Sequence, residues 1–120
     1  MYNYFMLMGR VVKEPEIKEY GENKRVLTLR LAVSRSFKNM NGEVETDFFN
    51  ITFWEFLVDY IKDNIKKGQP VLVKGRIQTT QEELANGFCL NVPTLIGERL
   101  LFFNNKSDIE NDSASIKKDE

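Results

Sequence analysis

The stretch Asp47-Phe48-Phe49-Asn50-Ile51-Thr52-Phe53-Trp54 combines aromatic rings with small hydrogen-bonding groups in alternating order. In an extended strand, neighbouring side chains point to opposite faces. One face would carry an apolar row: Phe49, Ile51 and Phe53. The other would carry large rings and small polar groups: Phe48, Asn50, Thr52 and Trp54. Rings spaced by polar groups suit flat ligands that stack, such as nucleobases. Packing of Phe48 and Trp54 under a loop or helix is the alternative, because aromatics are common in strands.

The sequence lacks the residue types that most catalytic and metal sites need. It has no histidine, the usual general base near neutral pH and the commonest metal ligand. The single cysteine, Cys89, can form neither an internal disulfide nor a Cys/His zinc set. Paired carboxylates fall in a predicted hairpin, on the exposed side of a predicted helix and in a loop: Glu43 and Glu45, Asp59 and Asp63, Glu82 and Glu83. None of these places suggests a cleft for acid–base work. We therefore expect a protein that is not an enzyme, with no catalytic residue, metal or cofactor.

The elements that must position the rings follow from periodicity. The 120-residue chain has the size of one domain, and 42% apolar residues are typical of a globular protein. Strands are predicted at residues 4–12, 25–34, 47–54, 70–79 and 88–103, and the polar segment 13–24 has room for a short strand at 16–20. Asn41-Gly42 is a strong hairpin signal, so the second and third strands should be antiparallel neighbours. The one helix is predicted at residues 55–67, with Gly68 placed to end it.

Five strands with one helix between the third and fourth are the element order of the OB-fold, a small Greek-key barrel. The prediction is therefore an all-β barrel with one helix over residues 1–104, followed by a short, acidic and disordered tail at 105–120. A small α+β sandwich is the alternative topology. Residues 4–12 and 100–103 are apolar on both faces, which a subunit interface would cover.

The charge and hydropathy of the sequence limit which binding partners and which cellular compartment we expect. The formal net charge is −1, but residues 107–120 carry −3, which leaves +2 for residues 1–106. A body this weakly basic predicts a modest salt dependence for any nucleic-acid binding. No apolar run reaches membrane-spanning length, and residues 2–8 lack a basic leader, so we expect a cytoplasmic protein without membrane contact.

Several motifs, in order and spacing, resemble the bacterial single-stranded DNA-binding proteins over nearly all of residues 1–104. They are Asn3 and residues 7–16, 31–37, 46–54, 66–68 and 73–79. The resemblance implies an OB-fold subunit, a homotetramer, and sequence-independent wrapping of single-stranded DNA in replication, recombination or repair, close to the nucleoid. It also implies that Phe37, Phe48 and Trp54 stack bases.

Two places depart from the family pattern. After Thr79 the family often has a basic run and a fourth aromatic, whereas this chain reads Thr80-Gln81-Glu82-Glu83. Phe88, across a short loop, is the candidate replacement ring. The chain ends in Asp119-Glu120 without the usual acidic-hydrophobic tip, which leaves recruitment of replication and repair proteins in doubt and fits a short accessory paralogue.

The candidate DNA-binding set adds cations and polar groups to these rings. Backbone contacts are assigned to Arg10, Lys13, Arg30, Arg35, Lys38, Lys74 and Arg76, with Asn50 and Thr52 between the rings. A competing hypothesis is an OB-type protein-interaction subunit of the primosome kind with weak DNA binding, which Glu82 and Glu83 favour. Use of the same face on RNA is a third.

Overall fold

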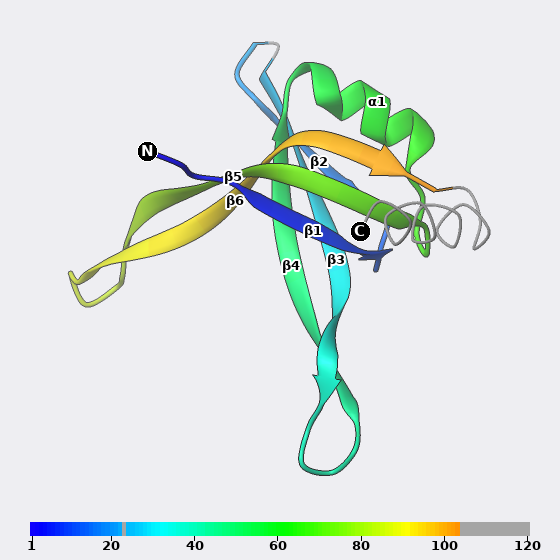
Figure 1. Cartoon of the computed structure of the whole chain (residues 1–120). Coiled ribbons are helices and arrows are strands. Elements are labelled where there is room, and N and C mark those ends of the chain that lie inside the picture. The colour runs from blue at the N-terminus through cyan, green and yellow to red at the C-terminus, as the bar shows by residue number, and fades with distance from the viewer. Residues whose placement is uncertain (23, 104–120) are drawn as a thin grey trace.

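The computed structural model describes residues 1–22 and 24–103, so the predicted tail at 105–120 lies outside the described residues. The elements in chain order are β1 (Phe5–Val11), β2 (Glu16–Tyr20), β3 (Lys24–Lys38), β4 (Val44–Trp54), α1 (Phe56–Asn64), β5 (Pro70–Glu83) and β6 (Cys89–Phe102) (Figure 1). The predicted class, an all-β domain with one helix between the third and fourth main strands, is confirmed.

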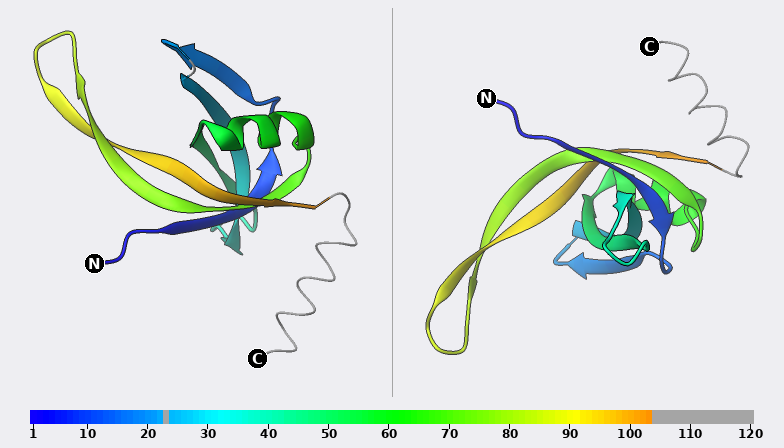
Figure 2. Two further views of the ribbon diagram at one scale, coloured as in Figure 1. Left: turned by 90° about the horizontal axis from the view of Figure 1, so that it is seen from above. Right: turned by 60° about the horizontal axis from the view of Figure 1, so that its bottom comes forward.

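The strands form one sheet that closes on itself. Their order is β1-β5-β6-β4-β3-β2, and a further pairing of β1 with β3 closes the barrel. All pairs are antiparallel except β4 with β6, which is the parallel pair that joins the two hairpins. The closed ring has five strands, as predicted, and residues 16–20 form a sixth, β2, which pairs with β3 outside the ring. The β3–β4 hairpin projects beyond the barrel in Figure 1, and the β5–β6 hairpin projects beyond it in Figure 2.

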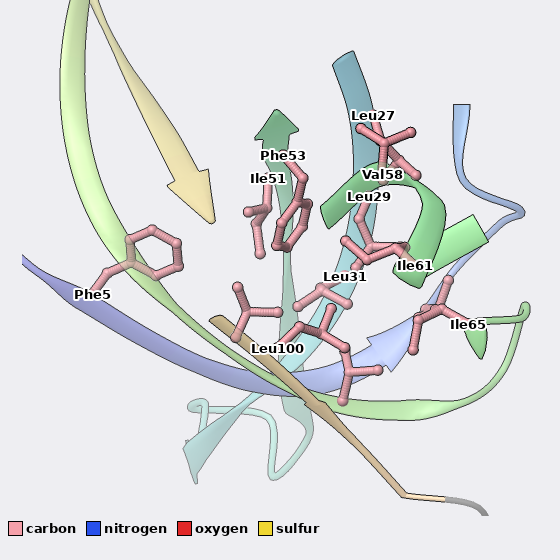
Figure 3. Packing of buried hydrophobic residues seen from close by; sticks show 13 residues of the cluster. Phe5, Leu27, Leu29, Leu31, Ile51, Phe53, Val58, Ile61, Ile65 and Leu100 are labelled. Carbon is pink, nitrogen blue, oxygen red and sulfur yellow. The ribbon is translucent and has the colours of Figure 1, made fainter. Parts of the chain in front are cut away.

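The core lies inside the barrel and under α1. The alternating residues of β3 and β4 that point inward are fully buried: Leu27, Leu29, Leu31, Ile51 and Phe53. The helix closes one end of this cluster with Val58 and Ile61 (Figure 3). Burial of each such side chain is worth about 1.5–3 kcal/mol. This packing makes the barrel a rigid support for whatever its outer face carries.

The helix is shorter than predicted, ending at Asn64 instead of residue 67. Ile65 leaves the helix with φ −106° and ψ 130°, and its side chain is buried in the core. Gly68 has φ +87° and makes the turn into β5, where its N–H donates to the carbonyl of Val11 at 2.7 Å. Packing of Ile65 therefore ends the helix one turn before the glycine that the sequence indicated.

Gly9 lies where β1 passes from β5 to β3. A Cβ atom at this position would collide with the carbonyl oxygen of Ala32 on β3. Directly after it, Arg10 pairs with Ala32 on one side and Pro70 on the other. The backbones of β1 and β3 therefore approach closely at Gly9, next to the pairing of Arg10 with Ala32 that closes the barrel.

Candidate nucleic-acid interface

The outer face of β3 and β4 carries the predicted rings. Residues paired across these strands share a face, and the outward pairs are Ala32 with Phe48, Arg30 with Asn50, Thr28 with Thr52 and Val26 with Trp54. Phe48 is 52% exposed and Trp54 is 44% exposed. Both rings therefore lie on the surface. The alternative prediction, in which Phe48 and Trp54 pack under a loop or helix, does not agree with this exposure.

Arg30 is held between Phe48 and Asn50. Its guanidinium carbon lies 5.2 Å from the centre of the Phe48 ring, and Nη1 donates to Asn50 Oδ1 at 3.1 Å. A cation over a ring face at an exposed site contributes roughly 0.5–1 kcal/mol. The arrangement places a positive charge beside a ring and a polar group, which suits a base and its phosphate.

A first groove lies at the Trp54 end of this face. The strand registers put Thr28, Thr52, Ile96 and Arg76 in one row across β3, β4, β6 and β5. The groove has a volume of about 360 Å³, and Trp54 lines it. Arg76 donates to Gln78 Oε1 at 3.2 Å, and Gln78 is itself in the groove wall. We name this hollow the Trp54 groove.

A second groove lies at the Phe48 end. Arg10, Ala32 and Phe48 form a row across β1, β3 and β4. Arg10, Ser34 and Thr46 line a hollow of about 340 Å³ beside this row, and Arg10 Nη1 donates to the carbonyl of Gly68 at 3.2 Å. Phe48 and Trp54 are six strand residues apart, roughly 20 Å at the usual rise. They therefore offer two separate stacking positions along one track.

The two hairpins carry the other predicted rings. Phe37 is 64% exposed on the projecting part of the β3–β4 hairpin, next to Lys38. Phe88 is 69% exposed at the tip of the β5–β6 hairpin, with Leu84 N–H donating to its carbonyl at 2.7 Å. Phe88 directly precedes β6 and is not among the residues that line the Trp54 groove. Lys74 lies apart, with its ammonium 5.8 Å from the centre of the Tyr4 ring.

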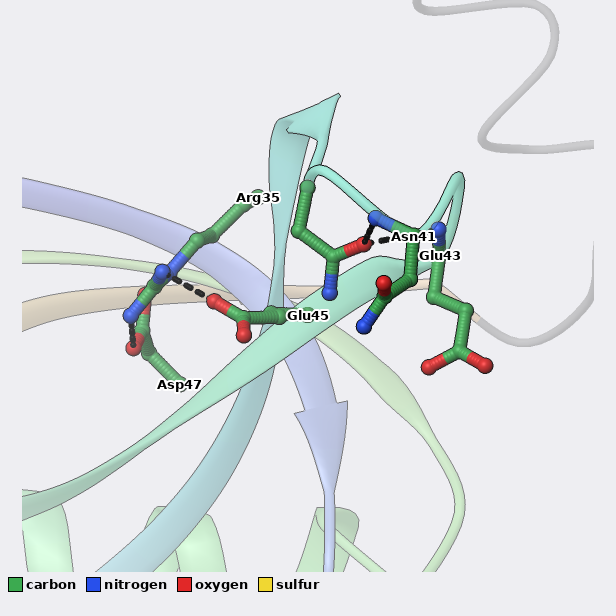
Figure 4. Close-up of polar contacts among 6 residues, drawn as sticks. Arg35, Asn41, Glu43, Glu45 and Asp47 are labelled. Carbon is green, nitrogen blue, oxygen red and sulfur yellow. Dashed lines mark hydrogen bonds and ion pairs between the residues drawn. The ribbon is translucent and has the colours of Figure 1, made fainter.

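Two predicted cations are engaged elsewhere. Arg35 makes two 3.0 Å bonds to the carboxylate of Asp47 and also pairs with Glu45 (Figure 4). Asp47 alternates with Phe48 along β4, so this cluster lies on the face away from the rings. The hydrogen bonds from Arg35 lower the pKa of Asp47, and those to Asp47 raise the pKa of Arg35. Lys13 is paired with Glu16 at 2.8 Å.

Of the residues that line the Trp54 groove, the sequence-based set included Thr52 and Trp54 and missed the others, among them Lys18 and Tyr20 on β2. The signal was the short extended segment 16–20, in which both residues alternate onto one face. Val26 pairs with Lys18 on one side and Trp54 on the other, so β2 widens the ring-bearing face by one strand.

Among residues 1–22 and 24–103, no three His, Cys, Asp or Glu side chains gather as metal ligands would. The helix there is neither long nor apolar enough to cross a bilayer.

Comparisons with known proteins agree with this geometry. The model of the single-strand binding protein family matches residues 2–103. The chain is 36% identical over 106 residues to single-stranded DNA-binding protein B of Bacillus subtilis (strain 168), covering 88% of this chain and 94% of that protein. It is 34% identical over 115 residues to the single-stranded DNA-binding protein of Streptococcus mutans serotype c, covering 96% and 70% respectively. A solved structure of a Plasmodium falciparum SSB complex with ssDNA matches with a TM-score of 0.73 at 29% identity, covering 87% of this chain and 96% of that one.

Proposed function

Because the chain belongs to the single-strand binding protein family, we propose that it binds single-stranded DNA without sequence preference and without catalysing a reaction. The observation that carries this proposal is the display of Phe48 and Trp54, both about half exposed, on one barrel face between two grooves. A single strand offers unpaired bases that can stack on such rings, whereas a duplex keeps its bases paired inside.

The mechanism combines stacking with backbone contacts. Each base stacked on Phe48 or Trp54 contributes roughly 1–3 kcal/mol and tolerates any sequence, because every base has a π face. Arg10, Arg30 and Arg76 contact phosphates beside these rings, while Asn50 and Thr52 hydrogen-bond along the track. Phe37 with Lys38, and Phe88, extend the surface onto the hairpins. Arg35 and Lys13 join only by leaving their carboxylate partners, and Lys74 contacts DNA at the margin of the face.

The biological role follows from this chemistry. A non-catalytic protein that coats exposed strands protects them during replication, recombination or repair, in the cytoplasm at the nucleoid. We place no replication or repair partner on the described residues, because the family's recruiting motif belongs to the tail.

The proposal includes a homo-oligomer, with a tetramer as the expected state. Tyr4, directly before β1, and Met6 and Met8 of β1 are all exposed, as is Leu101 of β6. Residues 5–9 of β1 pair with β5 on one side only, since β3 joins at Arg10. An open strand edge beside exposed apolar side chains is a ready site for a second subunit.

Titration of the chain with oligo-thymidine tests the function directly. Trp54 is the single tryptophan, so its fluorescence reports the proposed face. We expect strong quenching by single-stranded oligomers and little response to duplex of equal length. An RNA oligomer of matched length decides between DNA and RNA use. Unchanged emission at saturating single-stranded oligomer would overturn the proposal.

One observation favours the second candidate, an OB-type protein-interaction subunit. Glu82 and Glu83 lie on the projecting β5–β6 hairpin, next to Leu84 and close to Leu90, and both leucines are exposed. The double substitution Phe48→Ala with Trp54→Ala separates the two functions. A DNA binder loses affinity by orders of magnitude, whereas an adaptor that lacks DNA binding has no such affinity to lose.

A further inference from the structure

We propose that Tyr20 on β2 is an additional base-stacking residue, and that one nucleobase of the strand sits in the Trp54 groove between Tyr20 and Trp54, hydrogen-bonded along its edge. This inference rests on the proposed function and names how that site holds a single base.

The position of the two rings supports a base between them. Tyr20 and Trp54 both line the groove, and Tyr20 is 53% exposed. Their strands lie on either side of β3, two strand spacings apart, and Tyr20 is two residues beyond the row that joins Lys18, Val26 and Trp54. Strand geometry therefore separates the two backbones by roughly 12 Å.

The two rings do not pack on each other. Among the described residues, the aromatic pair in contact is Tyr60 with Phe102, whose centres are 6.1 Å apart. A base sandwiched between two rings needs about 7–8 Å between them, at 3.5–4.0 Å for each contact. Side chains that rise from backbones 12 Å apart can lean to this spacing. The small side chain of Val26, which pairs with Trp54 and is largely buried, also lines the groove.

The wall of the groove matches the edge of a base. Its polar residues are Thr28, Thr52, Gln78, Thr80 and Thr94. Hydroxyl and amide groups can each donate and accept, and base edges present donors and acceptors side by side. The volume of about 360 Å³ is at the small end of ligand pockets. Lys18 on the same wall supplies a charge for the adjoining phosphate.

The second groove does not have this combination. The second groove is lined by the cation Arg10 but by no aromatic ring. Its other lining residues include Met8, Ala32, Ser34 and Thr46. We therefore assign sandwiching and edge contact to the Trp54 groove alone, and backbone contact to the second groove.

Three variants test the inference: Tyr20→Leu removes the ring, Tyr20→Phe keeps it, and Tyr2→Leu removes a fully exposed ring outside both grooves. Affinity for oligo-thymidine is measured by titration, with thermal denaturation to verify the fold. Tyr20→Leu should weaken binding by about 5- to 150-fold. The affinities of Tyr20→Phe and Tyr2→Leu for oligo-thymidine should stay within about threefold of that of the unaltered chain. Such a change in binding free energy is no larger than the net contribution of one hydrogen bond.

An abasic oligomer of equal length isolates the stacking contribution. It keeps the phosphates and lacks the bases, so Tyr20→Leu should bind it as the unaltered chain does. Oligo-thymidine affinity unchanged by Tyr20→Leu would overturn the inference while leaving the proposed function intact. Failure of the unaltered chain to bind oligo-thymidine would instead overturn the proposed function.

Discussion

At the scale of single residues, Phe48 and Arg30 are already arranged as a pair. The Arg30 guanidinium covers the Phe48 ring at 5.2 Å and is also bound to Asn50. This contact orders a long side chain before any ligand arrives, so less conformational entropy is lost on binding. In the proposed complex, a base stacked on Phe48 would therefore meet the Arg30 cation already in position.

Replacing Phe48 separates stacking from charge. Phe48→Leu keeps apolar bulk but removes the ring face, so affinity for oligo-thymidine should fall by roughly 1–3 kcal/mol. The slope of log affinity against log salt should stay unchanged, because no cation is removed. Phe48→Tyr retains the ring and serves as the matched control. Equal affinities of the unaltered chain, Phe48→Leu and Phe48→Tyr for oligo-thymidine would mean that Phe48 does not stack a base.

Glu55 occupies a strained backbone conformation between β4 and α1. Its backbone has φ 53° and ψ −112°, a conformation that residues other than glycine rarely adopt. Two backbone hydrogen bonds hold it: its N–H donates to the Arg25 carbonyl at 3.2 Å, and its carbonyl accepts from Val58 at 3.0 Å. The turn places Trp54 outward and Val58 inward within four residues.

Glu55→Gly should stabilise the fold by about 1 kcal/mol. Relief of a strain of roughly 1–3 kcal/mol outweighs the 0.5–1 kcal/mol entropy cost of glycine. Thermal denaturation should give a Tm several degrees higher, and Glu55→Ala, which keeps the Cβ atom, should not reproduce the gain. A lower Tm for the glycine variant would mean that the Glu55 side chain contributes more than the strain costs.

At the scale of elements, two arginine–carboxylate ion pairs add contacts to those of the sheet, one between β3 and α1 and one within the β3–β4 hairpin. Arg25 on β3 makes bonds of 2.8 and 2.7 Å to the carboxylate of Asp59 on α1. Arg35 does the same to Asp47 within the β3–β4 hairpin. The first pair orients the helix over the barrel, and the second stiffens the hairpin that carries Phe37.

The pair between Arg25 and Asp59 predicts a pH-dependent contribution to stability. Hydrogen bonding from Arg25 lowers the pKa of Asp59 below its ordinary value, so the unfolded chain binds the proton more readily. The stabilisation is complete above the unfolded pKa of about 3.9 and is lost as pH falls through the lower, folded value. The effect is small because both side chains are partly exposed.

Denaturant unfolding between pH 7 and pH 2 checks this sign. Asp59→Asn should be less stable than the original chain at neutral pH, with the difference shrinking below pH about 4. Asp63→Asn, on the same helix but outside the ion pairs of the described residues, should show no such convergence. A difference that persists at pH 2 would mean that Asp59 acts by packing and not by charge.

At the scale of the whole molecule, the barrel leaves one face of β1 uncovered. Tyr4, Met6 and Met8 point outward with Leu101 nearby, and all four are exposed. Exposed apolar patches rimmed by polar residues mark interaction sites more often than free surface. In the proposed oligomer, a second copy of this chain would cover both the apolar side chains and the open edge of β1.

Charges placed on this face should dissociate the oligomer. Met6→Glu with Met8→Glu puts two carboxylates into the proposed interface, where burial without a partner is costly. Sedimentation velocity should show a fall from the oligomer toward the monomer. Met40→Glu, in the fully exposed turn of the β3–β4 hairpin, is the control and should leave the sedimentation coefficient unchanged. A monomeric unaltered chain would overturn the oligomer proposal itself.

The predicted ranges 25–34, 47–54 and 70–79 leave out the projecting parts of β3 (Lys24–Lys38), β4 (Val44–Trp54) and β5 (Pro70–Glu83). Periodicity alone nevertheless predicted the main strands, the helix and the division of β4 into a core face and a ring face. These are local properties: strand alternation assigns Phe48 and Trp54 to one side and Phe53 to the other before any packing is considered. Helix length and the role of β2 were less well predicted, because burial of Ile65 and pairing of residues 16–20 depend on distant partners.

Only the tertiary structure decided which cations accompany the rings. The sequence analysis assigned both Arg30 and Arg35 to the DNA-binding set, but Arg30 lies against Phe48, whereas Arg35 is bound by Asp47 and Glu45. The Trp54 groove likewise needs β2, β3, β4, β5 and β6 at once. A side chain's face follows from its own strand, whereas its partners follow from barrel closure, which brings together residues far apart in the chain.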